Sequence, residues 1–522
     1  MEPEQPVSRS ALAPFVVTAE QMRQIEERVF DAGMPVAALM EKVANLIHQI
    51  VCQRLDTWRI DAASSSCGVL AGPGHNGGDA LVVARELHLR GYSVCIHQPL
   101  EKAKALTASH ARYARSLGIP FVALEALGDC DLIIDGLFGF GLTRPLEGNL
   151  AKTVDTINGW SSPVISIDLP SGIHTDTGAV LGTAIRARET LCLGLWKRAC
   201  VQEAALPYLG HLTLIDFDLP IDDIQAVLGQ NPSVHRLTSA LALECLPLPR
   251  SQVTHKYKVG QLLVVAGSHT YAGAAILTAL GARASGVGML TVAVPQSLKP
   301  LIHTQLPEAL VVSCEETDSG AIAALPDDLD FSKYTAIACG PGLTRADAIV
   351  AAMLAAPVPL VLDADGLNTL AELGVELLEQ RQDETIITPH PGEFRRLFPD
   401  IWSQSQDAGV AAEAAAQQTG AVVIFKGARS AIATPQSQLW YLADSTPALA
   451  RGGSGDILAG LVAGLLAQNT GPHPALAAAL GGVWWHAQGA LLAASERTVL
   501  GVDPVTLASY LPHVLQIQAT AP

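Results

Sequence analysis

Two glycine-rich turns in this chain each end in an aspartate, and both lie where a strand and a helix should meet. Residues 72–79 end in Asp79 and directly follow an apolar stretch, whereas residues 451–456 end in Asp456 and directly precede one. Glycine allows positive φ and close approach of the backbone to a ligand, and a helix start presents free N–H groups and a positive dipole end. The two turns predict two pockets for phosphorylated ligands and two activities.

The first half also carries acids at the ends of strand-like stretches. Asp135 ends residues 131–135, and Asp168 ends residues 164–168 shortly before Ser171. Ligands of parallel sheets bind beyond the carboxyl ends of strands, so these groups should converge with the first turn. The candidate cluster is Asn76, Asp79, Asp135, Asp168 and Ser171. Its oxygen atoms suit hard cations rather than zinc or copper, and the structural alternative is that each acid caps the following helix.

The second half has its own series of motifs, each after a strand-like stretch. They occupy residues 266–273, 339–342, 363–368, 388–393 and 425–430, and the turn at 451–456 follows them. A carboxylate beside free amide groups can take a proton while the amides stabilise a phosphoryl group, which makes Asp456 the candidate base. Lys426 and Arg429 are the positive charges available to phosphates. Alternatively, Lys426 is a strand-end lysine that reaches solvent, and His390 serves only turn geometry between two prolines.

Composition excludes several classes of protein. The net charge of −17 argues against binding to nucleic acid or to an anionic membrane surface. No apolar run approaches the ~18 residues of a membrane span, and the N-terminus lacks a secretory signal. The nine cysteines form no CxxC pair, which indicates reduced core thiols. We therefore expect a cytoplasmic protein whose partners are small molecules.

The elements that position these residues follow an α/β alternation. Residues 18–21 form a capping box that predicts a helix start, and a second helix is expected over residues 35–55. The expected strands of the first half are 68–71, 93–97, 131–135, 164–168, 190–194 and 211–215. Those of the second half are 261–266, 289–294, 335–339, 359–363, 385–388 and 421–425. Alternating strands and helices predict parallel sheets covered on both faces.

The length of 522 residues requires more than one domain. We assign residues 1–14 to a loose N-terminus, 15–220 to a first domain, 221–238 to a linker and 239–522 to a second domain. The fold class is α/β, with two three-layer αβα domains. The two halves share no fixed repeat period, so they are expected to be different α/β folds rather than a duplication.

Residues 15–215 resemble the NAD(P)H-hydrate epimerase family. The family pattern is Asn-Asn-Gly-Gly-Asp, then a strand-end Asp before a glycine-rich loop, then Asp-x-Pro-Ser-Gly. The resemblance implies a Rossmann-like domain whose substrate site is formed by His75, Asn76, Gly77, Gly78, Asp79, Gly139, Phe140, Gly141, Leu142, Thr143, Arg144, Pro145 and Asp168. It further implies potassium held by Asn76, Asp135 and Ser171.

Two positions depart from that family pattern. His75 stands where the family usually has Asn, and Ala80 where it usually has Gly. Because histidine can still donate or accept a hydrogen bond, we expect altered tuning rather than loss of activity. The same fold resembles a domain of an mRNA-decapping scaffold, so a non-catalytic role is the alternative, against which the retained acids argue. Asp168 is our candidate for proton exchange with the hydroxyl at C6 of the hydrated ring.

Residues 240–515 resemble the ribokinase-like superfamily and, within it, the ADP/ATP-dependent NAD(P)H-hydrate dehydratases. The resemblance implies that Asp456 is the catalytic base. It implies a hydrated-nucleotide site at Ala274, Gly342, His390 and Asp456. It implies an ADP site at Lys426, Gly427, Ala428, Arg429, Ser430 and Gly455. Mg²⁺ should accompany the ADP or ATP, and Glu393 is a candidate to hold it through water.

The resulting hypothesis is a bifunctional repair enzyme for hydrated nicotinamide nucleotides. The first domain would interconvert the R and S hydrates, and the second would dehydrate the S form with ADP, or with ATP. The resemblance favours ADP, and we expect a homo-oligomer. The alternative is a kinase of a small alcohol, such as a vitamin precursor, joined to a nucleotide-binding scaffold.

Overall fold

The computed structural model describes residues 14–60, 65–405 and 407–520. The chain divides into two compact units between Pro232 and Ser233. This division falls within residues 221–238, the expected linker. That stretch nevertheless holds helix α7 (Ile221–Leu228), which packs on helix α1 (Ala19–Asp31) of the first unit, and strand β9 (Val234–Arg236), which pairs within the second.

The first unit is built on a six-stranded parallel sheet in the order β3-β2-β4-β5-β6-β8. The strands are β2 (Ser66–Ala71), β3 (Ser93–His97), β4 (Leu132–Gly136), β5 (Val164–Ile167), β6 (Glu189–Leu193) and β8 (His211–Ile215). Each matches an expected strand to within two residues. The chain leaves β2 first toward β3 and then returns to β4 on the other side. The gap between β2 and β4 is therefore the topological switch point, where ligands of such sheets bind.

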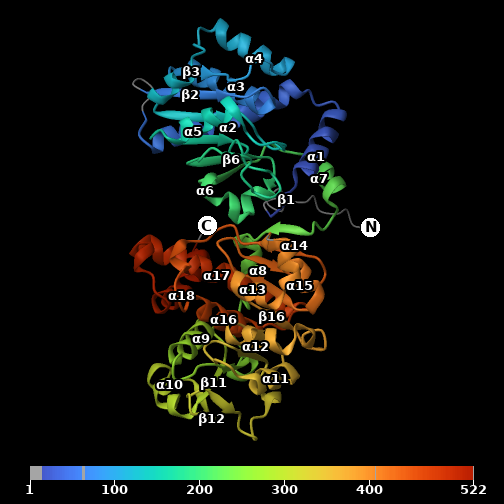
Figure 1. Cartoon of the computed structure of the whole chain (residues 1–522), viewed down its shortest axis with the longest axis vertical. Helices are drawn as coiled ribbons and strands as arrows, with labels where there is room; N and C mark the ends of the chain where they lie inside the picture. The colour runs from blue at the N-terminus through green and yellow to red at the C-terminus, as the bar shows by residue number, and fades with distance from the viewer. Residues whose placement is uncertain (1–13, 61–64, 406, 521–522) are drawn as a thin grey trace. The chain divides into compact units, whose positions relative to one another are not determined.

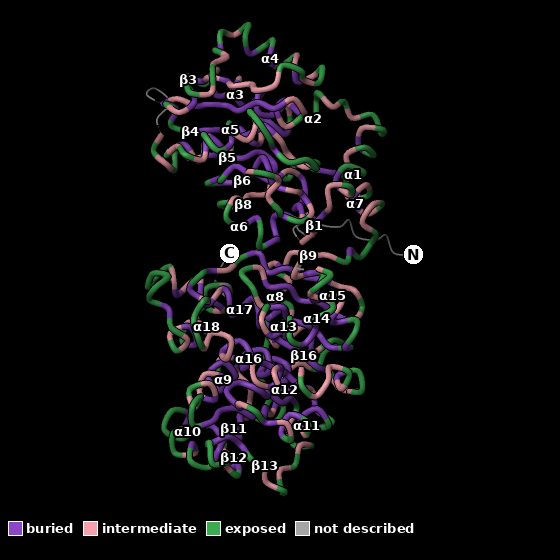
Figure 2. Tube along the Cα trace, in the orientation of Figure 1, coloured by how far each residue is buried: buried purple, intermediate pink, exposed green. Residues whose placement is uncertain are grey.

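Helices cover both faces of this sheet, as Figures 1 and 2 show. Alternate strand residues such as Val69 and Ile134 pack with α1 (Ala19–Asp31), α2 (Val36–Thr57), α3 (His75–Leu89) and α4 (Ala105–Ser116). The intervening residues, such as Leu70 and Ile133, pack with α5 (Gly148–Asn158). Two separate apolar faces explain why these strands read as continuous hydrophobic runs.

Helix α1 begins where the capping box predicts. The Thr18 hydroxyl accepts a hydrogen bond from the Gln21 N–H at 3.1 Å, and the Gln21 side chain accepts one from the Thr18 N–H at 2.9 Å. The prediction is confirmed, and the cap sets the start of a helix that carries residues toward the first site. A short parallel pair, β1 (Val16–Val17) with β7 (Trp196–Lys197), lies just before it and was not predicted.

The second unit contains an eleven-stranded sheet in the order β13-β12-β11-β10-β14-β15-β16-β17-β18-β19-β9. The expected strands are β10 (Gln261–Val265), β11 (Met289–Pro295), β14 (Ala336–Cys339), β15 (Leu360–Leu362), β16 (Thr385–Ile387) and β17 (Val422–Phe425). The sequence missed the remaining strands, β9, β12 (Leu310–Glu316), β13 (Ile322–Ala324), β18 (Ala431–Ala433) and β19 (Leu439–Tyr441). They lie toward the sheet edges, where short length and polar residues weaken the periodic signal.

Helices again lie on both faces of the second sheet (Figure 1). One face packs against α9 (Ala272–Ala284), α16 (Ser454–Leu466), α17 (Pro474–Arg497) and α18 (Pro504–Thr520). The other carries α11 (Asp347–Ala355), α12 (Asp365–Leu373), α13 (Pro391–Leu397) and α15 (Ala408–Thr419). The fold class of two three-layer α/β units is confirmed. None of the described helices combines the length and apolarity that a membrane crossing requires.

Candidate active sites

The first glycine turn lies at the switch point between β2 and β4. A Cβ on Gly72 would lie 1.7 Å from the Leu137 carbonyl oxygen, and one on Gly77 would lie 2.0 Å from the Gly72 oxygen. These glycines are needed for close backbone packing rather than for positive φ, which no glycine of residues 72–79 adopts. Helix α3 begins at His75, so Asp79 lies inside the helix and not at its start.

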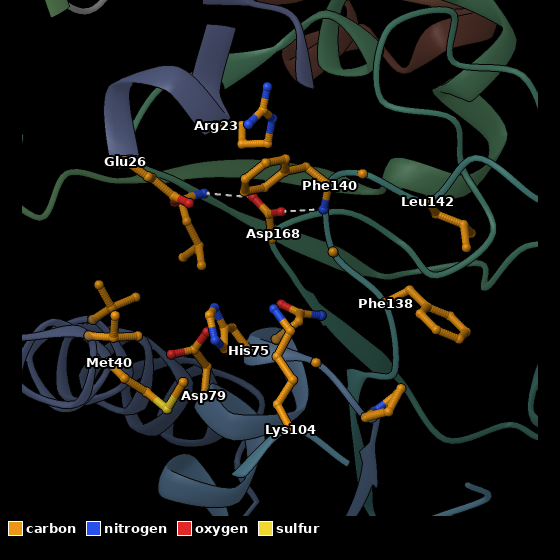
Figure 3. A pocket seen from close by; sticks show the side chains of 18 of the residues that line it. Arg23, Glu26, Met40, His75, Asp79, Lys104, Phe138, Phe140, Leu142 and Asp168 are labelled. Atoms are coloured by element: carbon orange, nitrogen blue, oxygen red, sulfur yellow. Dashed lines mark hydrogen bonds between the residues drawn. The ribbon is translucent and has the colours of Figure 1, made fainter. Parts of the chain in front are cut away.

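A cavity of about 700 Å³ opens at this turn. Of the predicted substrate residues, it is lined by His75, Asn76, Asp79, Gly139, Phe140, Gly141, Leu142, Thr143, Arg144 and Asp168. Gly77, Gly78, Pro145, Asp135 and Ser171 are not among its lining residues. Figure 3 shows Asp168 and Phe140 on one wall and His75, Asp79 and Lys104 on the opposite wall.

Asp168 has the most constrained position in this cavity. Its φ of 70° is a left-handed conformation that non-glycine residues rarely adopt. Its carboxylate accepts hydrogen bonds from the Phe140 N–H at 2.7 Å and the Leu193 N–H at 3.5 Å. The ammonium of Lys197 lies 2.6 Å from the same carboxylate. Three donors, one of them a cation, fix the Asp168 carboxylate at the cavity wall.

Lys197 was not predicted from the sequence. Its side chain is fully buried, and burial by itself would lower its pKa, yet the adjacent Asp168 raises the pKa above the ordinary value. The lysine therefore stays charged and paired. The available signal was a lysine directly after the apolar run that contains β6.

Two further acids face the cavity. Burial raises the pKa of Asp79 well above its usual range, and the charges of Asp168 and Glu26 add to this effect. Burial also raises the pKa of Glu26, on α1, to about 7, against the opposing charge of Lys197. The sequence missed Glu26 because one glutamate on an amphipathic helix carries no motif.

Asp135 and Ser171 lie in direct contact beneath the cavity. The Ser171 hydroxyl donates to Asp135 at 2.6 Å and the Ser171 N–H at 2.9 Å, while the Ser166 hydroxyl and the Leu137 N–H also donate to it. Burial raises the pKa of Asp135 even against these bonds. The helix-capping alternative is wrong for Asp79, Asp135 and Asp168, since the helices that follow them have other caps or include the acid.

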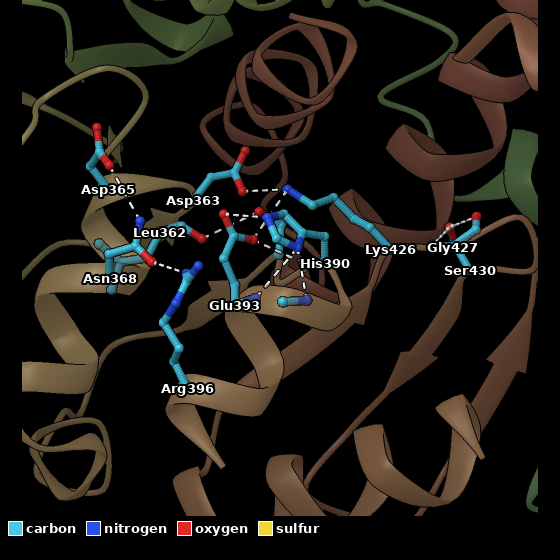
Figure 4. A network of polar contacts seen from close by, with 12 residues as sticks. Leu362, Asp363, Asp365, Asn368, His390, Glu393, Arg396, Lys426, Gly427 and Ser430 are labelled. Carbon is cyan, nitrogen blue, oxygen red and sulfur yellow. Dashed lines mark hydrogen bonds and ion pairs between the residues drawn. The ribbon is translucent and has the colours of Figure 1, made fainter. Parts of the chain in front are cut away.

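In the second unit, Lys426 lies close to two acids that follow other strands, Asp363 after β15 and Glu393 in α13 (Figure 4). Its ammonium lies 2.5 Å from Asp363 and 3.9 Å from Glu393. Burial alone would lower the pKa of Lys426, but Asp363 and Glu393 raise it above its ordinary value. The alternative of a lysine reaching into solvent is wrong, since only 19% of its side chain is exposed.

Asp456 lies in the first turn of α16, directly after the second glycine turn. Gly453 has a φ of 93°, so positive φ is required in this turn. A Cβ on Gly455 would lie 3.6 Å from the Lys426 ammonium and 3.9 Å from Asp363, which places these groups together. Burial and the charge of Asp363 raise the pKa of Asp456 to about 7, although Lys426 opposes the shift.

His390 has the turn-forming role that was considered for it. Its Nδ1 accepts hydrogen bonds from the Gly392 and Glu393 N–H groups, and it caps α13 as the first half of a capping box. The other ring nitrogen carries the proton in this arrangement and lies 3.3 Å from Glu393. About half of the side chain remains exposed and available to a ligand.

Gly342 and Ala274 lie at the switch point of the second sheet, between β10 and β14. A Cβ on Gly342 would lie 2.8 Å from that of Ala274, and the φ of Gly342 is 67°. Gly427 and Ser430 form a local turn through the Ser430 hydroxyl. Among the residues that the structure describes, no group of three or more His, Cys, Asp or Glu side chains could hold a metal ion.

These features define a class: a two-unit α/β enzyme with a separate candidate site in each unit. A family model described as NAD(P)H-hydrate dehydratase matches residues 262–513, and one described as YjeF-related protein N-terminus matches residues 36–199. A relative in Thermosynechococcus vestitus, named bifunctional NAD(P)H-hydrate repair enzyme, is 53% identical over 96% of this chain and 98% of the relative. One of the same name in Synechocystis is 52% identical over 95% of this chain and 94% of the relative.

The chain belongs to the family of bifunctional NAD(P)H-hydrate repair enzymes. Among solved structures, it is similar to an ADP/ATP-dependent NAD(P)H-hydrate dehydratase from Bacillus subtilis, crystallised with ATP and Mg²⁺. That similarity has 31% identity and a TM-score of 0.47, and it covers 54% of this chain and 98% of the other.

Proposed function

We propose that the first unit interconverts the R and S hydrates of NADH and NADPH, and that the second unit dehydrates the S hydrate with ADP or ATP. The observation that carries the proposal is the similarity to bifunctional relatives along nearly the whole chain, which spans both sites. The fusion is chemically coherent, because a dehydratase specific for one epimer leaves the other unused unless a partner converts it.

In the dehydration site, Asp456 takes the proton of the C6 hydroxyl as that oxygen attacks the terminal phosphorus of the nucleotide. A base with a pKa of about 7 suits this transfer. The N–H groups at the start of α16 and the ammonium of Lys426 face the phosphoryl group and offset its charge. The ring nitrogen then expels phosphate from C6, and loss of a C5 proton restores the double bond of the reduced nicotinamide.

The remaining predicted residues surround these reacting groups. Ala274, Gly342 and His390 are proposed to contact the hydrated nucleotide. Lys426, Gly427, Ala428, Arg429, Ser430 and Gly455 are proposed to hold ADP. Ala274 and Gly342 pack closely together at the sheet's switch point, where ligands of such sheets bind, which supports their assignment to the substrate.

Asp363 and Glu393 fit the Mg²⁺ that would accompany the nucleotide. Two buried carboxylates share the single ammonium of Lys426, so negative charge exceeds positive charge there. Mg²⁺ is usually bound through one or two carboxylates plus substrate phosphates and water, so a cluster of three protein ligands is not required. When bound, the ion would neutralise charge on the phosphates.

In the epimerisation site, we propose Asp168 as the catalytic carboxylate next to C6 and Asn76, Asp135 and Ser171 as the potassium ligands. The burial of the Asp135 carboxyl group and its direct contact with Ser171 support a cation there. The ion would stabilise the loop that carries Gly139 to Pro145 without entering the reaction. A cytoplasmic location and a homo-oligomeric assembly stay predictions from the sequence.

The test is to supply mixed hydrates with ADP, with ATP or with neither, and to follow the absorbance of the reduced nicotinamide. Full recovery of both epimers, only with a nucleotide present, is expected. Recovery that stops at the S fraction would remove the epimerase assignment. A stable phosphorylated product in place of reduced nicotinamide would indicate the small-alcohol kinase alternative.

A further inference from the structure

Of the acids that line the first cavity, Asp168, Asp79 and Glu26 have different surroundings. Asp168 pairs with Lys197 and accepts hydrogen bonds from two backbone N–H groups. Asp79 is 8% exposed, and burial raises its pKa well above the usual range. The pKa of Glu26 is raised to about 7 by burial. Environments that separate the pKa values of neighbouring acids are typical of acid–base sites.

Proton exchange needs a carboxyl group that can both give and take a proton. Asp168 is poorly suited, because its carboxylate is already engaged by the fully buried ammonium of Lys197 and by two backbone N–H groups. Asp79 is poorly suited because its burial disfavours the ionised form and raises its pKa. Among the described residues, no hydrogen bond or ion pair engages the Glu26 carboxyl group, and it faces the cavity beside Asp168 in Figure 3.

We propose that Glu26 is the group that exchanges the proton with the C6 hydroxyl during epimerisation, while Asp168 acts as a fixed anion beside the ring. The inference deepens the proposed epimerase function and rests on it. Glu26 donates a proton to the hydroxyl as the C6–O bond breaks, water leaves, and the ring nitrogen forms an iminium cation with C6. Water returns from the other face, the C6–O bond re-forms, and Glu26 takes the proton back.

This division of roles matches the charges in the cavity. The iminium intermediate is positive, and a carboxylate fixed beside the ring by Lys197 stabilises it. Burial brings the pKa of Glu26 to about 7, where its two protonation states are both populated. The charged groups facing Glu26 are Lys197, Asp168 and Lys104, with Asp79 across the cavity. Arg23 and Glu27, on the same helix, pair with each other at the rim.

The full-length protein supplies its own control. With excess nucleotide, mixed hydrates lose the S fraction in a fast phase set by the second unit. The R fraction then follows in a slow phase set by the first unit. We expect Glu26→Gln to lower the slow phase by about 100-fold or more, the typical value of a general acid–base group, and to leave the fast phase unchanged. Glu20→Gln, at an exposed glutamate of the same helix, should change neither phase.

The pH profile separates Glu26 from Asp168. The rate of the slow phase in the wild type should change with pH near 7. Asp168→Asn should keep this pH dependence at a lower rate, whereas Glu26→Gln should lose it. Glu26→Asp should restore part of the rate together with its pH dependence. If the melting temperature of Glu26→Gln differs from that of the wild type, the comparison with Glu26→Asp tests the role of the carboxyl group.

Several outcomes would overturn the inference. One is a Glu26→Gln slow phase within about threefold of the wild type. Others are loss of the pH dependence in Asp168→Asn alone, or a Glu26→Asp variant no better than Gln. A wild type without any enzyme-dependent slow phase would instead refute the epimerase function itself.

Discussion

The ammonium of Lys426 lies 2.5 Å from the carboxylate of Asp363, and both groups face Gly455 at the start of α16. A strand-end lysine, a strand-end acid and a helix start thus meet at one point of the second unit. The lysine keeps its charge because two acids offset its burial. A fixed cation at a helix start is an arrangement that binds phosphate, and its members can be altered one at a time.

Removal of the Asp456 carboxylate should separate the two activities. We expect Asp456→Asn to lower dehydration by at least about 100-fold, because the proton of the C6 hydroxyl has no acceptor. Interconversion of the epimers, followed by chromatography of the hydrates without nucleotide, should continue at the wild-type rate. Simultaneous loss of both activities in a folded variant would contradict a two-site enzyme.

Dehydration should depend on pH in a defined direction. The pKa of Asp456 is raised to about 7, and the base must be deprotonated to act. At saturating Mg²⁺ and nucleotide, kcat/KM for the S hydrate should therefore fall as pH decreases through 7 and level off above it. A rate that rises on acidification would show that the protonated form is the active one.

Loss of the Lys426 charge should weaken nucleotide binding. Lys426→Met is expected to raise the KM for ADP about tenfold or more and also to lower kcat, because the ammonium contacts charge that grows during phosphoryl transfer. Lys333→Met, at an exposed lysine, is the matched control. Equal KM values for ADP in the two variants would place the phosphates elsewhere.

Small residues between α9 and α16 should matter for stability rather than for chemistry. A Cβ on Gly460 would lie 1.8 Å from the Thr278 carbonyl oxygen, so Gly460→Ala must push the two helices apart. We expect a loss of about 1–3 kcal/mol in the free energy of unfolding. Gly273→Ala, where nothing lies within 4 Å of the added carbon, should not destabilise the protein. Thermal denaturation of both variants checks the difference.

Potassium should matter only to the first unit. Replacement of K⁺ by a bulky organic cation of equal ionic strength should slow epimerisation, because Asp135 would lose the counter-charge that we propose there. Dehydration of the S hydrate by the same sample should not change. Epimerisation that is indifferent to this exchange would remove potassium from the site.

Much of this protein could be predicted without coordinates. The twelve strands predicted from apolar runs all form, because hydrophobic alternation with helical segments is a local pattern. The capping box at Thr18 is equally local, since both partners lie within one turn. The positions of acids at strand ends predicted the location of the candidate sites, because the carboxyl ends of parallel strands lie at the same edge of the sheet.

Only the tertiary structure decided the identity of the groups around those acids. Glu26 comes from α1 and Lys197 from β7, and neither belongs to a motif. Their burial and their pairing with other charges arise from packing of segments far apart in the sequence. The chain by itself determined which strand ends carry carboxylates. The fold determined how deeply each carboxylate is buried and which charges lie beside it, because burial and neighbouring charge depend on distance in space.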